Sequence, residues 1–203
     1  MDAEGSTPQT GLKNPGRFKA GTGFMVGGIM FMLLTNLLEA SVPGFSVRND
    51  AISTLGGNGY PVELLWNTQL FVEGILWLFS TYLLFRGKGH RLMSFSFYLA
   101  GIGILLVSLD PWNVRGTLHG IGAQMGFLFG AISAITSPKI LDGRLRVLGP
   151  AMGALAIFAV ICGALGTTLG LGGGGLERLV YYPIFLWEIA FGSCLLSKDP
   201  ITY

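Results

Sequence analysis

The chain has 203 residues, of which 51% are hydrophobic and 12% are charged, and its formal net charge is only +2. Soluble domains usually carry about a quarter charged residues, so this composition excludes a soluble globular domain. We therefore expect an integral membrane protein that contacts the lipid bilayer and has no nucleic-acid partner.

The first 19 residues are polar and contain glycine and proline. They lack the basic start and the short apolar core of a cleaved signal peptide. The pattern predicts a polar N-terminal tail over residues 1–19, a single transmembrane domain over 20–197 and a C-terminal tail over 198–203.

Six apolar segments are each long enough to cross a bilayer core, which takes about 20 residues. They span about residues 20–43, 65–86, 91–109, 116–136, 146–170 and 176–197. None alternates with the period of a strand, and lipid admits only helices or closed barrels. The sequence predicts an all-α membrane protein, a bundle of six transmembrane helices.

Basic residues divide unevenly between the two sides of this bundle. The two tails and the second and fourth connections hold ten of the 13 Lys and Arg residues, whereas the other side holds Arg48, Arg115 and Arg178. The positive-inside rule then places both termini in the cytoplasm, in a multi-pass protein of the cell membrane.

The longest connection, about residues 41–63, faces outward in this topology. Asn49 or Asp50 before an apolar run that ends at Gly56 is typical of a capped short helix, which we expect to lie in the membrane interface. Capping alone would explain Asp50. The length of the connection also favours a lid over a pocket.

Polar side chains near the outer helix ends form the predicted site. Ionisable groups at membrane depth usually face the bundle interior and pair with one another, so we expect these side chains to converge in a polar vestibule. We assign ligand binding to Asn36, Glu39, Asp50, Asn67 and Arg115, and an acid–base role to Asp110 and His119.

Three of these residues have a simpler alternative role. Asp110 precedes Pro111, which is the pattern of a helix start with a capping carboxylate. Arg115 can snorkel to the interface. His119 is either a core histidine with satisfied hydrogen bonds or a proton carrier. The sequence leaves these alternatives open.

Two carboxylates, Glu73 and Glu188, lie deep in apolar segments. Glu73 lies on the order of 13 Å from the outer end of its helix, close to the bilayer midplane. Burial would hold such carboxyl groups neutral, so they serve either a proton-linked role or hydrogen bonding between helices.

The two histidines limit the cofactors. His90 lies in a cytoplasmic connection and His119 near the outer surface, which excludes a haem ligated by both. Two histidines also exclude a three-histidine zinc site. We assign no metal site, and the cofactor stays unknown.

Glycines recur at helical spacing in the second half of the chain. The fourth segment contains a glycine at every fourth position, Gly122, Gly126 and Gly130. The fifth segment begins with Gly149 and Gly153 and ends with Gly166 and Gly170. Such small faces predict close helix packing, either within the chain or with a membrane partner or a second copy. The run "LGLGGGG" before Leu176 predicts a flexible outer turn.

Two blocks, "NDAISTLGGNGYPVELLWNTQLFVEGILWL" and "GIGILLVSLDPWNVRGTLHGIGAQMGFLFGAI", resemble the domain-of-unknown-function 998 family of prokaryotic six-helix membrane proteins. The chain has "LDPW" where that family has "FP" followed by an acid. The matching positions are Asn49, Ser53, Leu55, Gly56, Asn67, Asp110, Pro111 and His119. Because the family has no established activity, the resemblance implies a six-helix architecture and an outer site without naming a reaction.

Three functions fit these observations. The first is binding of a polar small molecule or lipid headgroup in the vestibule, with Arg115 contacting an anionic group and Asp110 and His119 transferring protons. The second is a scaffold or accessory subunit, and the third is a proton-coupled transporter that uses Glu73 and Glu188. The sequence does not decide whether the protein is an enzyme.

The topology can be tested by cysteine labelling. In a background without cysteines, single cysteines in place of Ser6 and Asn58 should react with an impermeant maleimide from opposite sides of the membrane. Labelling of both from the same side would contradict the predicted orientation.

Overall fold

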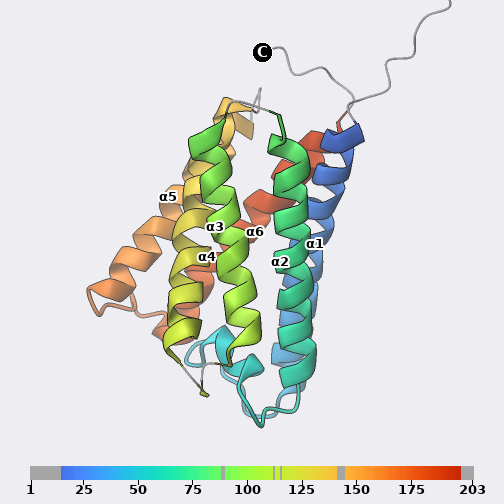
Figure 1. Ribbon diagram of the computed structural model, residues 1–203. Coiled ribbons are helices and arrows are strands. Elements are labelled where there is room, and N and C mark those ends of the chain that lie inside the picture. The colour runs from blue at the N-terminus through green and yellow to red at the C-terminus, as the bar shows by residue number, and fades with distance from the viewer. Residues whose placement is uncertain (1–14, 88–89, 112, 115, 141–144, 198–203) are drawn as a thin grey trace, which may run out of the picture.

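The computed structural model describes residues 15–87, 90–111, 113–114, 116–140 and 145–197. This part of the chain contains no strand and six helices that are long and apolar enough to cross a membrane. They are α1 (Pro15–Ser41), α2 (Glu63–Phe85), α3 (Arg91–Leu109), α4 (Thr117–Thr136), α5 (Leu145–Ala164) and α6 (Gly172–Leu196) (Figure 1). Two short 3-10 helices, η1 (Ile52–Gly56) and η2 (Ser137–Lys139), complete the structure. The predicted six-helix architecture is confirmed.

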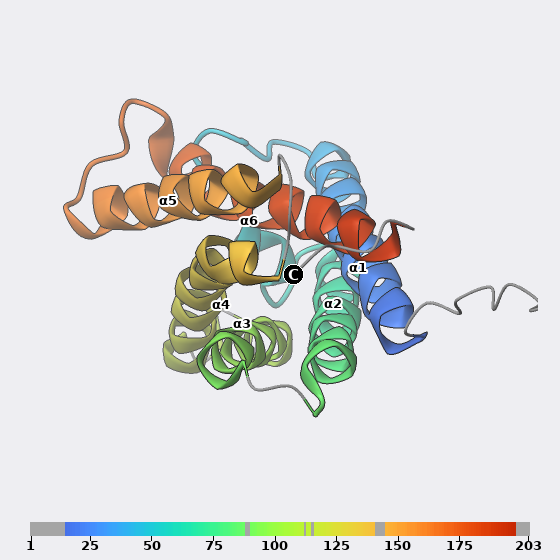
Figure 2. The ribbon, with the colours of Figure 1, turned by 90° about the horizontal axis from the view of Figure 1, so that it is seen from above.

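The helices follow one another around a ring. Each of the six packs against the next one in the chain, and α6 closes the ring against α1 (Figure 2). The first residue of α1 and the last residue of α6 lie at one end of the bundle, here called the termini end. The connection over residues 42–62 covers the opposite end, here called the loop end (Figure 1).

Aromatic side chains fill the centre of the bundle toward the termini end. The Phe24 ring meets those of Trp77, Phe97 and Phe191 at centroid distances of 5.4–5.8 Å, mostly edge to face. The Trp77 indole also donates a hydrogen bond to the Phe97 carbonyl at 2.8 Å. Such aromatic pairs contribute about 0.5–1.5 kcal/mol each beyond burial. This half of the bundle is therefore the rigid part of the fold.

Glycines bring neighbouring helices into backbone contact. A Cβ at Gly103 of α3 would lie 2.4 Å from the Gly126 nitrogen of α4, and a Cβ at Gly153 of α5 would lie 2.5 Å from the Ala131 carbonyl oxygen. The predicted close packing at these positions is confirmed, and its contacts lie within the chain. The prediction was wrong for Gly166 and Gly170, which follow the end of α5 with φ of 73° and 76°.

The glycine run before Leu176 is helical, so the predicted flexible turn is wrong. Residues 172–175 form the first turn of α6, and the backbone of the 42–62 connection crosses directly over them. A Cβ at Gly172 would lie 2.2 Å from the Arg48 carbonyl oxygen, and one at Gly174 would lie 2.2 Å from that of Asp50. Only residues without a side chain allow this crossing.

The boundaries of the other helices also differ in places from the prediction. α1 begins at Pro15, inside the predicted N-terminal tail, and α5 ends at Ala164 rather than near residue 170. α3 has the predicted bounds. Apolar composition continues past the end of α5, and turn-forming glycines rather than polarity set that end.

A pair of glycine substitutions tests the close packing. Gly103→Ala should lower the free energy of unfolding by about 1–3 kcal/mol, because its Cβ would meet the backbone of α4. Gly120→Ala, whose Cβ meets nothing within 4 Å, should leave stability unchanged or raise it by up to about 1 kcal/mol through helix propensity. Thermal unfolding of the purified variants in detergent measures both, and equal effects would contradict the packing.

Candidate functional site

The connection over residues 42–62, here called the lid, has a local structure of its own. The Asp50 carboxylate accepts a hydrogen bond from the Ser46 N–H at 2.7 Å and so closes the turn before η1. The residue that precedes η1 is Ala51, without a side-chain cap, so neither Asn49 nor Asp50 caps the short helix as predicted. Ile52 of η1 is buried, and η1 packs against α1, α2 and α6 at the loop end.

Hydrogen bonds tie the lid to the first turns of α6. Arg178 donates from Nη1 to the Asp50 carbonyl at 3.1 Å and to the Gly174 carbonyl at 2.8 Å. The Glu177 carboxylate accepts the Ile52 N–H at 2.6 Å. The lid backbone and α6 are therefore joined by two ionisable side chains, of which Arg178 is buried and Glu177 is partly buried.

Further contacts hold the lid to other parts of the loop end. The Asn67 side chain on α2 donates to the Gly56 carbonyl at 3.0 Å. Asn58 and Asn113 exchange two hydrogen bonds of 2.8 and 3.0 Å, which connect the lid to the segment between α3 and α4. The lid is thus anchored on three sides.

The central contact of the loop end is a buried ion pair between Arg178 of α6 and Glu39 of α1. Both side chains are about 5% exposed. The sequence pattern instead predicts Glu39 beside Arg115 and His119, and Arg178 only as one of the outer basic residues. The signal for this pair was present, because Glu177 and Arg178 are two charges inside an apolar segment.

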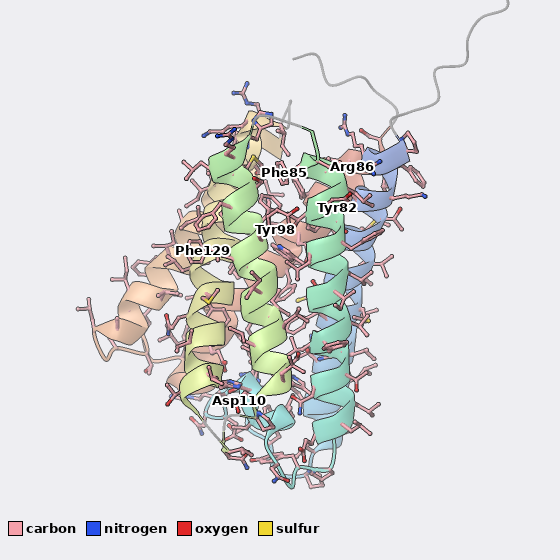
Figure 3. The ribbon with its side chains drawn as sticks, viewed as in Figure 1. Tyr82, Phe85, Arg86, Tyr98, Asp110 and Phe129 are labelled. Carbon is pink, nitrogen blue, oxygen red and sulfur yellow. The ribbon has the colours of Figure 1, made fainter. Side chains whose placement is uncertain are left out.

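Asp110 and His119 lie together, as predicted, and both are buried at the loop end (Figure 3). The Asp110 carboxylate accepts the backbone N–H of His119 at 3.1 Å, and His119 Nδ1 lies 2.9 Å from the Asp110 carbonyl oxygen. A carbonyl only accepts, so Nδ1 is the donor in this contact, and in the neutral ring Nε2 is then the nitrogen with the lone pair. Asp110 therefore both caps the first turn of α4 and orients the ring of His119.

A narrow cavity of about 60 Å³ lies beneath the lid. Its lining is almost entirely apolar, so the predicted polar vestibule is wrong. A few polar residues do line it, among them Trp66, His119, Glu177 and Tyr181. Trp66 Nε1 is buried and has no hydrogen-bond partner in the described part of the chain, whereas the Tyr181 hydroxyl is in hydrogen-bonding contact with the side chain of Tyr182. Trp66 therefore brings one unpaired donor to the wall of an apolar space.

A groove of about 330 Å³ adjoins this cavity between α4, α5 and α6. α5 leans away from α4 toward the loop end, which leaves the groove between them (Figures 1 and 2). Phe127 and Glu177 line both spaces, and Gln124, Ala159 and Gly163 are among the other groove residues. The groove thus lies between three helices that are each long and apolar enough to cross a membrane.

The remaining predicted residues that the structure describes lie outside the lid and the cavity beneath it. Asn36 is exposed on α1, where its side chain contacts the Met32 carbonyl and the Tyr182 hydroxyl, so it does not join the lid. Arg115 lies outside the described residues. Glu73 and Glu188 are fully buried away from the lid. Among the described residues, no group of three His, Cys, Asp or Glu side chains could hold a metal ion.

Comparison with known families agrees with this architecture. A family model described as "Protein of unknown function (DUF998)" matches residues 25–193. The chain belongs to this family. The match begins in α1 and ends in α6, so it includes the lid and all the helices of the DUF998 protein. No curated protein and no solved structure matches the chain.

The buried ion pair should contribute strongly to the stability of the DUF998 protein. Arg178→Ala should cost about 3–5 kcal/mol of unfolding free energy, because it leaves the Glu39 carboxylate buried without a partner. Arg48→Ala should cost little, since Arg48 is exposed and donates only one long hydrogen bond of 3.3 Å to Gly170.

Thermal unfolding in detergent compares the two variants. The double substitution Glu39→Leu with Arg178→Met should recover part of the loss, because it removes both charges together. Equal destabilisation by Arg178→Ala and Arg48→Ala would show that the ion pair does not hold the loop end.

Proposed function

We propose that this membrane protein binds an amphipathic molecule, a lipid or a lipid-like small molecule, at its loop end. The polar oxygens of the ligand would lie in the cavity and its apolar chain in the groove. The observation that carries this proposal is an apolar cavity that adjoins a groove and is lined by Trp66, whose buried Nε1 has no partner among the described residues, together with Tyr181 and His119.

An unpaired donor favours a ligand that accepts hydrogen bonds. A buried polar group without a partner costs about 1–3 kcal/mol, which a ligand oxygen would recover on binding. His119 Nε2 adds an acceptor, since Nδ1 is engaged with Asp110. A ligand with both an ester or ether oxygen and a hydroxyl group therefore matches the cavity.

The charges beneath the lid favour a neutral headgroup. Arg178 is paired with Glu39, and no Lys or Arg side chain lines the cavity among the described residues. An unpaired anion would meet the carboxylate of Glu177 there. The sequence-based alternative is an anionic headgroup held by Arg115. It predicts that an anionic ligand binds more tightly than a neutral one.

Proton transfer on such a ligand would run through His119. Its Nε2 lone pair belongs to a ring that lines the cavity, whereas the Asp110 carboxylate is engaged with the backbone. We therefore assign the acid–base role to His119 and a positioning role to Asp110. Asn67 and Asp50 support the lid rather than contact the ligand.

We further propose that the loop end faces the outside of the cell and takes its ligand from the outer leaflet. The termini end carries the larger number of basic residues in the described part of the chain, which supports cytoplasmic termini by the positive-inside rule. Arg86 is one of them, over the Tyr82 ring (Figure 3). The others are Arg17, Lys19, Arg91, Lys139 and Arg146.

Binding of monoolein, a neutral single-chain glyceryl ester, tests the proposal. Native mass spectrometry of the purified protein should detect one bound molecule per chain. Tyr181→Phe should weaken this binding about 2- to 10-fold, the value of one neutral hydrogen bond. Tyr82→Phe is the matched control, because Tyr82 is exposed near the termini end and does not line the cavity (Figure 3).

The histidines provide a second comparison. His119→Ala should weaken binding of monoolein, whereas His90→Ala should not, because His90 is exposed at the termini end. Unchanged binding in both Tyr181→Phe and His119→Ala would contradict the proposed site. If oleyl phosphate binds more tightly than monoolein and Arg115→Gln removes that difference, the headgroup is anionic.

A further inference from the structure

Two carboxyl groups meet in the middle of the bundle, away from the lid. Glu73 of α2 and Glu188 of α6 are both 0% exposed. They converge on neighbouring glycines of α1, because a Cβ at Gly27 would lie 2.2 Å from Glu73 Oε2 and one at Gly28 would lie 3.0 Å from Glu188 Oε2. The two glycines leave the space that the carboxyl groups occupy.

Most of the unpartnered atoms around this point are oxygen acceptors, and the Ser80 hydroxyl beside Gly23 of α1 is a further unpartnered group. Apart from their contact with each other, the carboxyl groups of Glu73 and Glu188 accept no hydrogen bond from the described residues. Gln69, one helical turn from Glu73, donates from Nε2 to Thr35 of α1 at 2.8 Å. Its Oε1 is buried and unpartnered in the same α1–α2 contact. A site in which acceptors outnumber donors favours a cationic or donating ligand.

Among the described residues, no cationic side chain compensates these carboxyl groups. Apart from each other, neither Glu73 nor Glu188 interacts there with a charged group. Gly27 and Gly28 of α1 lie against them, and the ion pair of Arg178 lies at the loop end. Two ionised carboxylates buried without counter-charge in a membrane-spanning bundle would cost many kcal/mol, so a positive charge must accompany them.

We propose that Glu73 and Glu188 form a binding site for a monovalent cation, a proton or an alkali-metal ion, in the middle of the membrane-spanning bundle. The cation bridges the carboxyl groups of α2 and α6 across the glycine pair of α1, so it holds these three helices together. The site uses none of the lid contacts and stands whether or not the cavity takes a lipid.

Linkage between cation binding and stability tests the site in the full-length protein. The melting temperature of the wild type in detergent should rise by about 3–5 °C for a tenfold increase in the concentration of the bound cation. Exchange of choline chloride for NaCl at constant ionic strength tests whether sodium is the bound cation. Titration from mildly alkaline to mildly acidic pH tests whether a proton is the bound cation.

Substitution isolates the carboxyl pair from the other titrating groups. Glu73→Gln with Glu188→Gln should abolish the dependence on that cation, whereas Glu63→Gln should retain it. Glu63 is the matched control, since it lies on the same helix and its carboxylate is engaged with the Gly59 N–H at 2.9 Å. If the double variant fails to fold, each single glutamine variant should still show a reduced dependence.

A hydrophobic carbodiimide distinguishes the two cations, because it modifies only protonated carboxyl groups. If labelling of Glu73 or Glu188 falls with rising pH and does not change with sodium concentration, the bound cation is a proton. If sodium suppresses the labelling, the bound cation is an alkali-metal ion. The proposal is overturned if the wild type and the double variant show the same dependence of melting temperature on both pH and sodium. Neither result depends on binding of monoolein.

Discussion

The loop end of this protein depends on one buried ion pair. Arg178 satisfies the Glu39 carboxylate of α1 and, through its other nitrogen, the Asp50 carbonyl of the lid. It therefore joins the first and last helices of the ring to the connection that covers them. Because a buried charge without its partner is costly, this contact fixes the lid in one position. The cavity beneath the lid exists only while that position is kept.

The two ends of the bundle differ in what fills their centres. Toward the termini end, Phe24 packs against three aromatic neighbours. Toward the loop end, α5 diverges from α4, and the cavity and groove adjoin at Phe127 (Figure 1). The proposed ligand site therefore lies in the half of the bundle that is open between its helices. The carboxyl pair of Glu73 and Glu188 lies where α1, α2 and α6 meet.

Hydropathy was sufficient to predict the helices, because bilayer thickness sets their length. The proximity of Asp110 and His119 was also predictable, since a short connection joins their helices. The partner of Glu39 was not, because it depends on how α6 returns to α1 at the close of the ring. The glycine run at 172–175 was misjudged for a similar reason. Its helical form depends on a lid backbone that lies more than a hundred residues earlier in the chain.

Photocrosslinking tests the central claim, a lipid site beneath a lid held by Arg178, most directly. A monoacylglycerol with a diazirine in its acyl chain would be irradiated with the protein in bilayers and the modified residues located by mass spectrometry. The account predicts modification of cavity and groove residues such as Phe127 and Ile184, suppressed by excess monoolein. Modification confined to exposed residues such as Leu64 and Leu92, which monoolein does not suppress, would contradict it.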